Sequence, residues 1–264
     1  MYDFEYRRAR SVDEAAERLA ASPEAKLLAG GMTLLPTMKL RLAQPDTLVD
    51  LGGISELTGV SGADPLEIGA MTTHGQIAAS DAVRSNIPAL AALAGRIGDP
   101  QVRNRGTIGG SVANSDPAAD YPAAVLALAA TVRTNRREIP ADDYFRGMFE
   151  TALEPEEIIV AVRFPKPRRA AYAKFANPAS GYAVVGVFVA ETHAGVRVAV
   201  TGAGPCVFRV PEMEAALARD FDPETLAGIE VPADDLNEDL HASAAYRAHL
   251  IGVMARRAVA AARG

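Results

Sequence analysis

The chain has 264 residues, of which 49% are hydrophobic, so it can form one large or two modest domains with a real core. Its 33 acidic residues outnumber its 27 lysines and arginines, and the net charge of −6 disfavours a nucleic-acid partner. The single cysteine, Cys206, excludes an internal disulfide, a cysteine-based zinc site and an iron–sulfur cluster held by this chain alone.

The first part of the chain predicts a small β-α-β unit. Ser11 and Glu14 have the spacing of a capping box, so a helix should follow and end near residues 22–23. Short strands are predicted at residues 26–29 and 47–51, with a short helix at 32–41 between them. The first of these strands stops at the glycine pair Gly30 and Gly31.

The middle of the chain alternates between strand and helix patterns. A hairpin is predicted over residues 59–72, and helices are predicted at 76–79, 87–97 and 121–130. Strands are expected at residues 131–133, 137–139 and 158–164. Residues 103–122 contain three glycines and several small polar residues, and we interpret them as a glycine-rich loop that runs into an apolar helix.

A proline-rich, charged segment at residues 164–169 is the best candidate for a domain boundary. Beyond it, antiparallel strands are predicted at residues 171–175, 183–190, 196–201 and 207–210. Helices at residues 212–220 and 243–261 are expected to pack on that sheet. The pattern as a whole indicates an α+β protein in two parts.

The chain carries no pattern of a secreted or membrane-spanning protein. Its first residues are acidic and aromatic, without the apolar run of a signal peptide. The longest nearly apolar run, residues 122–132, is shorter than the ~20 residues that a membrane-spanning helix needs. We therefore expect a cytoplasmic protein without membrane insertion.

Two glycine-pair segments are candidates for a shared ligand, one at Gly30 and Gly31 and the other at Gly109 and Gly110. Bare N–H groups beside glycines can bind an anion without any lysine, so two facing loops would clamp a diphosphate from both sides. Carboxylates such as Asp116 would then accept hydrogen bonds from sugar hydroxyls. On this chemistry alone, nucleotide binding and simple structural turns are equally good explanations.

Other kinds of site lack support. The segment after Gly202 misses the third glycine of a Gly-x-Gly-x-x-Gly motif, and no lysine stands in a P-loop context. The four histidines lack the spacing of metal ligands, and no Gly-x-Ser-x-Gly nucleophile motif occurs. We therefore assign neither a metal site nor a catalytic residue.

At these loops the sequence resembles a known family, the FAD-binding medium subunits of molybdenum hydroxylases, which includes the carbon monoxide dehydrogenase and xanthine dehydrogenase group. The resemblance covers nearly the whole chain in order. One difference is Met32, which stands where many members carry histidine or glutamine. The matching segments are residues 28–41, 68–74, 97–111, 116–122 and 180–186.

The resemblance implies a fold and a cofactor. The expected fold is α+β, with a two-subdomain FAD-binding domain of the vanillyl-alcohol-oxidase (PCMH) type followed by a small C-terminal α+β domain with an antiparallel sheet and helices. The expected boundaries are residues 1–167, with subdomains at about 1–55 and 56–167, and residues 168–264.

The resemblance also implies which residues contact FAD. The first dinucleotide loop would hold the pyrophosphate, and the second loop, which contains Gly109 and Gly110, would be the other dinucleotide loop. Asn114 and Asp116 would lie along the ribityl and pyrophosphate side, and Asp120 would hold a hydroxyl of the adenosine ribose. A few residues elsewhere would contact the flavin and adenine ends. These expected contacts are Leu28, Ala29, Gly30, Gly31, Met32, Thr33, Leu34, Ile97, Thr107, Gly109, Gly110, Ser111, Asn114, Asp116, Asp120, Ile159, Val160 and Lys174.

By similarity, the function would be that of an electron-transfer flavoprotein subunit, an oxidoreductase component. Partner chains would carry molybdopterin and two-iron two-sulfur clusters, in a large and a small subunit that assemble with this chain as a dimer of heterotrimers. Two alternatives remain open at this point. One is a self-contained FAD-dependent oxidase or reductase of the same fold, and the other is a nucleotide-binding regulatory module without redox chemistry.

Overall fold

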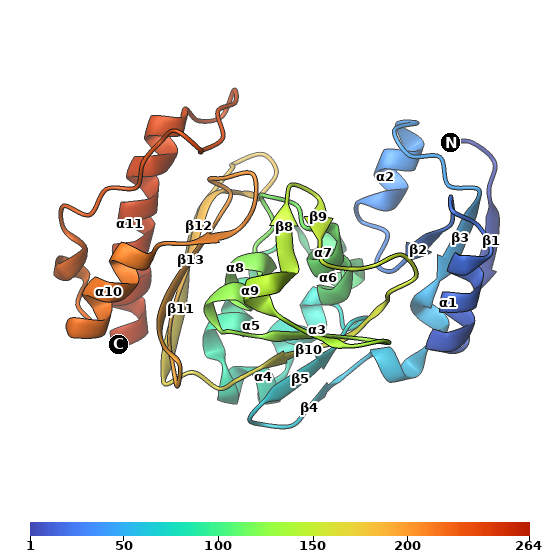
Figure 1. Cartoon of the computed structure of the whole chain (residues 1–264), viewed down its shortest axis with the longest axis horizontal. Helices are drawn as coiled ribbons and strands as arrows, with labels where there is room; N and C mark the ends of the chain where they lie inside the picture. The colour runs from blue at the N-terminus through green and yellow to red at the C-terminus, as the bar shows by residue number, and fades with distance from the viewer.

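The computed structural model describes residues 1–264. Its N-terminal part is a three-stranded parallel sheet in the order β1-β3-β2, at the right of Figure 1. The predicted β-α-β unit is confirmed, whereas the parallel edge strand β1 was not predicted. The elements are β1 (Glu5–Arg8), α1 (Val12–Ala20), β2 (Lys26–Leu28), α2 (Leu34–Lys39), β3 (Thr47–Asp50) and the 3-10 turns η1 (Leu51–Gly53) and η2 (Ser55–Leu57).

The cap of α1 differs in one bond from the predicted capping box. The Ser11 hydroxyl accepts from the Glu14 N–H at 3.1 Å, as a box requires. The Glu14 carboxylate, however, accepts from the N–H of Arg10 at 2.8 Å, one residue before the cap. The helix start and one of the two bonds of the box therefore follow the prediction, and the second bond is made one residue earlier.

A five-stranded antiparallel sheet follows in the order β4-β5-β10-β6-β7, with β10 at its centre. The predicted hairpin of β4 and β5 is confirmed, and so are the strands that contribute to this sheet. A separate small hairpin, β8 with β9, was not predicted. The strands are β4 (Val60–Ser61), β5 (Leu66–Gly69), β6 (Thr131–Thr134), β7 (Glu138–Pro140), β8 (Phe145–Gly147), β9 (Glu150–Thr151) and β10 (Ile159–Phe164).

A layer of short helices packs beside this sheet in the centre of Figure 1. Here the structure corrects the sequence analysis, because most of residues 103–122 form helices instead of a loop. The Thr107 side chain caps α7, in which Ile108 and Val112 are buried one turn apart. The helices are α3 (His74–Ala79), α4 (Asp81–Asn86), α5 (Pro88–Gly95), α6 (Pro100–Arg105), α7 (Ile108–Asn114), α8 (Tyr121–Ala127) and α9 (Ala141–Tyr144).

The C-terminal part is an antiparallel sheet in the order β11-β12-β13-β14, covered on one face by α10 and α11 as predicted. Its other face joins the central core. Val187 and Val189 belong to the C-terminal cluster, while the alternating residues Phe188 and Ala190 belong to the central one. The elements are β11 (Arg169–Ala176), β12 (Ala183–Thr192), β13 (Gly195–Thr201), β14 (Phe208–Arg209), α10 (Pro211–Arg219), η3 (Pro223–Leu226) and α11 (Ala244–Arg263).

A buried carboxylate, that of Glu157, fastens the segment before β10 to the end of β6. Its side chain is 0% exposed and accepts from the Thr134 hydroxyl at 2.7 Å, from the Glu154 N–H at 2.8 Å and from two nitrogens of Arg137 at 2.9 Å. The Arg137 guanidinium is the main reason why the pKa of Glu157 falls from 4.5 to about 2.

None of the helices combines the length and the apolar character needed to cross a membrane.

Candidate cofactor site

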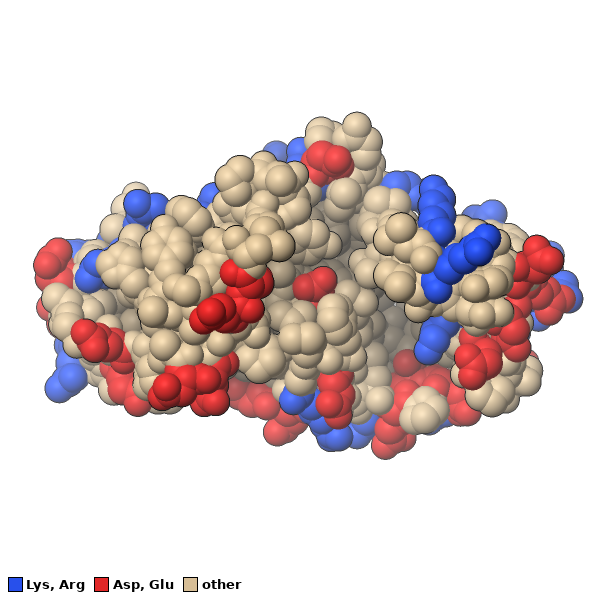
Figure 2. Space-filling model, turned by 90° about the horizontal axis from the view of Figure 1, so that it is seen from above, with Lys and Arg blue, Asp and Glu red and all other residues tan.

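A cavity of about 220 Å³ opens where the three parts of the chain meet. On the face in Figure 2 the hollow lies between the N-terminal unit, at the right, and the rest of the molecule. It is smaller than the sites of typical organic ligands, so a dinucleotide would extend from it along the open groove. Its walls come from the turn after β2, from the segments around α6 and α7, and from the turn before β12.

The turn after β2 supplies the first wall. The N–H groups of residues 29–33 donate to no acceptor elsewhere in the chain, backbone or side chain. Gly31 has a φ of +74°, which glycine adopts without strain. Gly30 lies so close to the end of α6 that a Cβ atom there would be 2.2 Å from the Arg105 carbonyl oxygen. The result is a concavity of bare N–H groups, the kind of backbone site that binds phosphate.

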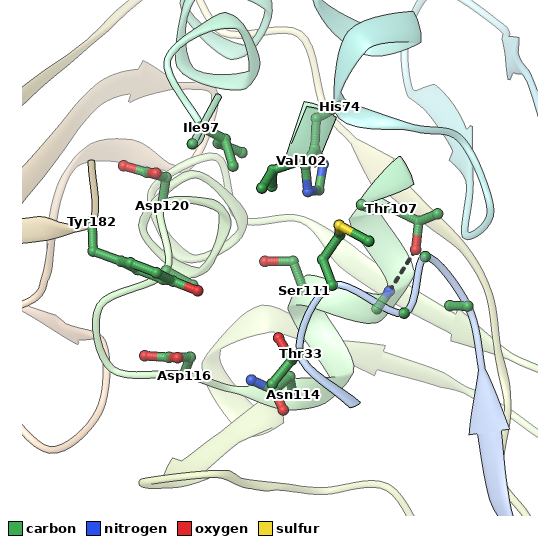
Figure 3. Close-up of a pocket in the computed structure, with 18 of the residues that line it drawn as sticks. Thr33, His74, Ile97, Val102, Thr107, Ser111, Asn114, Asp116, Asp120 and Tyr182 are labelled. Carbon is green, nitrogen blue, oxygen red and sulfur yellow. Dashed lines mark hydrogen bonds between the residues drawn. The ribbon is translucent and has the colours of Figure 1, made fainter. Parts of the chain in front are cut away.

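The second glycine segment differs from what its sequence suggests. At the start of α7 the N–H of Ile108 donates to Thr72, that of Gly109 to the Ala70 carbonyl, and that of Gly110 to the Thr107 hydroxyl at 3.1 Å (Figure 3). The expectation of two facing N–H cradles is therefore wrong. This wall presents side chains instead, among them the Ser111 hydroxyl, which lies toward the cavity in Figure 3.

Two carboxylates lie on the far side of the cavity. Asp116 accepts from the Ala118 N–H at 2.9 Å, which holds the turn before α8. Asp120 is 4% exposed, accepts from the Tyr172 hydroxyl and pairs with Lys174 at 3.1 Å. Burial raises the pKa of Asp120, and the nearby Lys174 ammonium opposes that effect. Figure 3 shows the side chain of Tyr182 between the two carboxylates.

Twelve of the expected contacts line this cavity, and six do not. Gly109 instead packs against the end of β5, where a Cβ atom would be 2.6 Å from that of Ala70. Ile159 is buried in the central core, and Lys174 lies behind the wall. The twelve are Ala29, Gly30, Gly31, Met32, Thr33, Ile97, Thr107, Gly110, Ser111, Asn114, Asp116 and Asp120, and those outside are Leu28, Leu34, Gly109, Ile159, Val160 and Lys174.

Nine lining residues were not among the expected contacts. Eight of them lie in the segments that carry the family resemblance, 68–74, 97–111, 116–122 and 180–186, and Leu27 begins the first loop that the resemblance implies. The resemblance therefore indicated the segments, whereas which of their residues face the cavity depends on how distant segments fold against one another. The nine are Leu27, His74, Gly98, Val102, Gly106, Ala119, Ser180, Gly181 and Tyr182.

His74 is the one histidine at the site. It is 4% exposed, its Nδ1 atom has no hydrogen-bond partner, and its ring lies 5.3 Å from that of Tyr121. Burial lowers its pKa from 6.5 to about 4, so the imidazole is neutral at neutral pH. Together with Ile97 and Val102, it makes an uncharged side of the cavity (Figure 3).

We expect His74 to make the protein sensitive to mild acid. The pKa is lower in the folded chain than in the unfolded one, so the unfolded state gains the proton first as the pH falls from 6.5 to 4. The free energy of unfolding should drop by about 3 kcal/mol over that range. Urea unfolding at a series of pH values would measure this slope, and His74→Phe should flatten it. An equal slope in both proteins would contradict the assignment.

The fold and the cavity thus define a nucleotide-binding module, and comparisons identify its family. A model of the FAD binding domain in molybdopterin dehydrogenase matches residues 2–167, and a model of the CO dehydrogenase flavoprotein C-terminal domain matches residues 170–262. The chain belongs to this family of FAD-binding medium subunits of molybdenum hydroxylases.

Individual relatives align over almost their full length. The nicotine 6-hydroxylase medium subunit of Paenarthrobacter nicotinovorans is 38% identical, over 94% of this chain and 93% of its own. The carbon monoxide dehydrogenase medium chain of Hydrogenophaga pseudoflava is 37% identical, over 98% and 96%. A chain in the structure of reconstituted CO dehydrogenase from Oligotropha carboxidovorans superposes with a TM-score of 0.91 at 34% identity, covering 99% of this chain and 98% of its own.

The residues present suit FAD. The bare N–H groups of residues 29–33 match a diphosphate, and the hydroxyl, amide and carboxylate groups of Ser111, Asn114 and Asp116 match the hydroxyls of a ribityl chain or ribose. The uncharged side with Ile97 and Val102 suits a flat aromatic ring. No group of three or more potential metal-ligating side chains occurs in the chain.

Proposed function

We propose that this chain is the electron-transfer subunit of a multi-subunit molybdenum hydroxylase or dehydrogenase and acts in the cytoplasm. It would receive electrons from iron–sulfur centres of a partner subunit and pass them through FAD to a final acceptor. The observation that carries the proposal is that residues 29–33, whose N–H groups have no acceptor in the chain, line the same cavity as the polar side chains of α7. When bound, FAD supplies the ability to accept and release electrons.

The residues of this chain would bind and orient the cofactor without taking part in bond chemistry. The first loop holds the diphosphate through backbone N–H groups, so the apolar side chain of Met32 is compatible with binding. We propose as direct contacts the twelve expected residues that line the cavity. We also propose the division into a FAD-binding domain at residues 1–167, with subdomains at about 1–55 and 56–167, and a C-terminal domain at 168–264.

We infer partner chains because the proposed electron transfer needs iron–sulfur and molybdenum centres that this chain has no ligands to hold. With one cysteine it cannot hold an iron–sulfur cluster, and it offers no metal-ligating group of side chains. Relatives are named as medium subunits or chains of larger enzymes, such as nicotine 6-hydroxylase and carbon monoxide dehydrogenase. We therefore propose a large molybdopterin-binding partner and a small iron–sulfur partner, assembled as a dimer of heterotrimers.

Native purification would test this function. We expect the chain to co-purify with a large and a cysteine-rich small subunit, and the complex to show flavin absorption that bleaches on adding the substrate of the large subunit. The control is the isolated chain loaded with FAD, which the same substrate should leave oxidised. An isolated chain whose flavin is reduced directly by an organic substrate would instead establish a self-contained oxidase or reductase. A chain that binds no flavin at all would overturn both enzyme functions.

A further inference from the structure

Lys174, on β11 of the C-terminal sheet, is buried behind the cavity with 2% of its side chain exposed. Its Nζ atom lies 3.1 Å from the Asp120 carboxylate, 3.0 Å from the Arg96 carbonyl oxygen and 2.9 Å from the Gly181 carbonyl oxygen. An ammonium group has three N–H donors, and here each has one acceptor. Lys174 therefore has no hydrogen left for a ligand.

The three acceptors belong to three different walls of the cavity. Asp120 lines it directly, Arg96 immediately precedes the lining residues Ile97 and Gly98, and Gly181 is itself part of the lining. Two of these walls also touch, since a Cβ atom on Gly181 would be 3.7 Å from the Cα atom of Gly98. A single cation thus joins the segments after α5, before α8 and before β12.

We propose that Lys174 is a positioning residue for the FAD site, which holds these three walls together from behind instead of contacting the cofactor. The proposal rests on FAD binding in this cavity. Without the ammonium, two partly buried carbonyl groups would lose their donor and the buried Asp120 carboxylate would keep only that of Tyr172, so the walls would separate to reach water. The C-terminal domain would in this way shape a site that lies mostly in the FAD-binding domain.

The charge of Lys174 matters as much as its hydrogen bonds. The titratable and charged groups around Asp120 are few, and among them Lys174 makes the ion pair. Burial raises the pKa of Asp120 and the Lys174 cation opposes that effect. If the cation is removed, the pKa should rise further, so the carboxyl group should hold a proton at a higher pH. A protonated Asp120 is a poorer acceptor for a sugar hydroxyl. The groups facing Asp120 are Lys174, Arg96, Tyr172, Tyr121 and Tyr182, with Asp116 further along the same segment.

The test is FAD affinity of the full chain, measured by quenching of FAD fluorescence between pH 6 and 9. We expect Lys174→Met to weaken binding by about tenfold or more at pH 7, the effect of losing hydrogen bonds made by a charged group. Affinity should recover partly as the pH rises and Asp120 loses its proton. Lys166→Met, an exposed lysine before β11, is the matched control and should bind like the wild type.

A double variant separates positioning from direct contact. If Lys174 acts through Asp120, Lys174→Met/Asp120→Asn should bind no worse than Lys174→Met and should lose its pH dependence. Additive losses, or unchanged affinity in a folded Lys174→Met protein, would overturn the proposal. Should that variant not fold by circular dichroism, Lys174→Gln keeps two donors and is judged by the same criteria, and failure of both to fold would show a purely structural lysine. A wild-type chain that binds no FAD would contradict the proposed function instead.

Discussion

Gly30→Ala should purify as a folded protein that retains almost no FAD. A Cβ atom at this position would be 2.2 Å from the Arg105 carbonyl oxygen and 2.7 Å from the Cα atom of Gly106, so backbone must move on one side or the other. The required shift of about 1 Å would pull the N–H cradle away from α7, and misplacements of that size commonly cost about a hundredfold in a pre-organised site. The measurement is the flavin-to-protein absorbance ratio after purification.

A matched glycine substitution controls for general effects on the fold. Gly252 lies within α11, and a Cβ atom there would have no neighbour within 4 Å. Gly252→Ala should therefore keep full flavin content and gain slightly in stability, because alanine favours the helix. Full flavin content in Gly30→Ala would show that the close approach of the two segments is unnecessary and that the diphosphate is bound elsewhere.

Glu157→Gln should cost about 3 kcal/mol of unfolding free energy at pH 7 and remove a step of acid denaturation. The pKa of Glu157 is about 2 in the folded chain and 4.5 without its partners, so its contribution is complete above pH 4.5. It is lost as the pH falls from 4.5 toward 2, because the unfolded chain takes up the proton first. Urea unfolding of wild type and variant across this range gives both quantities.

The neighbouring Glu156 provides the control for that experiment. Its carboxylate pairs with Arg136 at 2.8 Å, but both side chains are substantially exposed. An exposed pair contributes less than about 1 kcal/mol, so Glu156→Gln should hardly change the unfolding curve. Equal effects of the two variants would contradict the special role assigned to the buried carboxylate.

The sequence predicted those strands whose apolar residues stand at the positions that the folded sheet buries. The strands β2 and β3, the β4–β5 hairpin and the C-terminal antiparallel sheet carry apolar residues at the positions that the sheets bury. The edge strand β1 has four exposed residues, so it has no apolar alternation to reveal it. Helix α7 was missed because its glycine pair suggested a loop. The sequence does contain the features of a helix there, since Thr107 is an N-cap residue and the apolar residues Ile108 and Val112 are one turn apart.

The cavity was predictable along the two glycine segments, where local chemistry and family resemblance agree. The sequence pattern could not show which backbone N–H groups lack an acceptor in the folded chain. Gly109 and Gly110 look like the first glycine pair in sequence, but their N–H groups are taken by the Ala70 carbonyl and the Thr107 hydroxyl. The neutral state of His74 and the saturated donors of Lys174 also depend on burial by distant segments, which single-residue patterns do not encode.

The segment before α8 is held by strands that are synthesised much later. The Gly202 N–H donates to the Pro117 carbonyl oxygen at 2.7 Å, the Thr201 hydroxyl lies 2.6 Å from the Ala119 carbonyl oxygen, and the Ala183 N–H donates to Ala118 at 3.3 Å. A nascent chain that has released only its first 180 residues therefore has an incomplete cavity wall. Since domains fold as they emerge, this wall closes late on the ribosome or after release. We therefore expect the cofactor to bind only after the C-terminal sheet is complete.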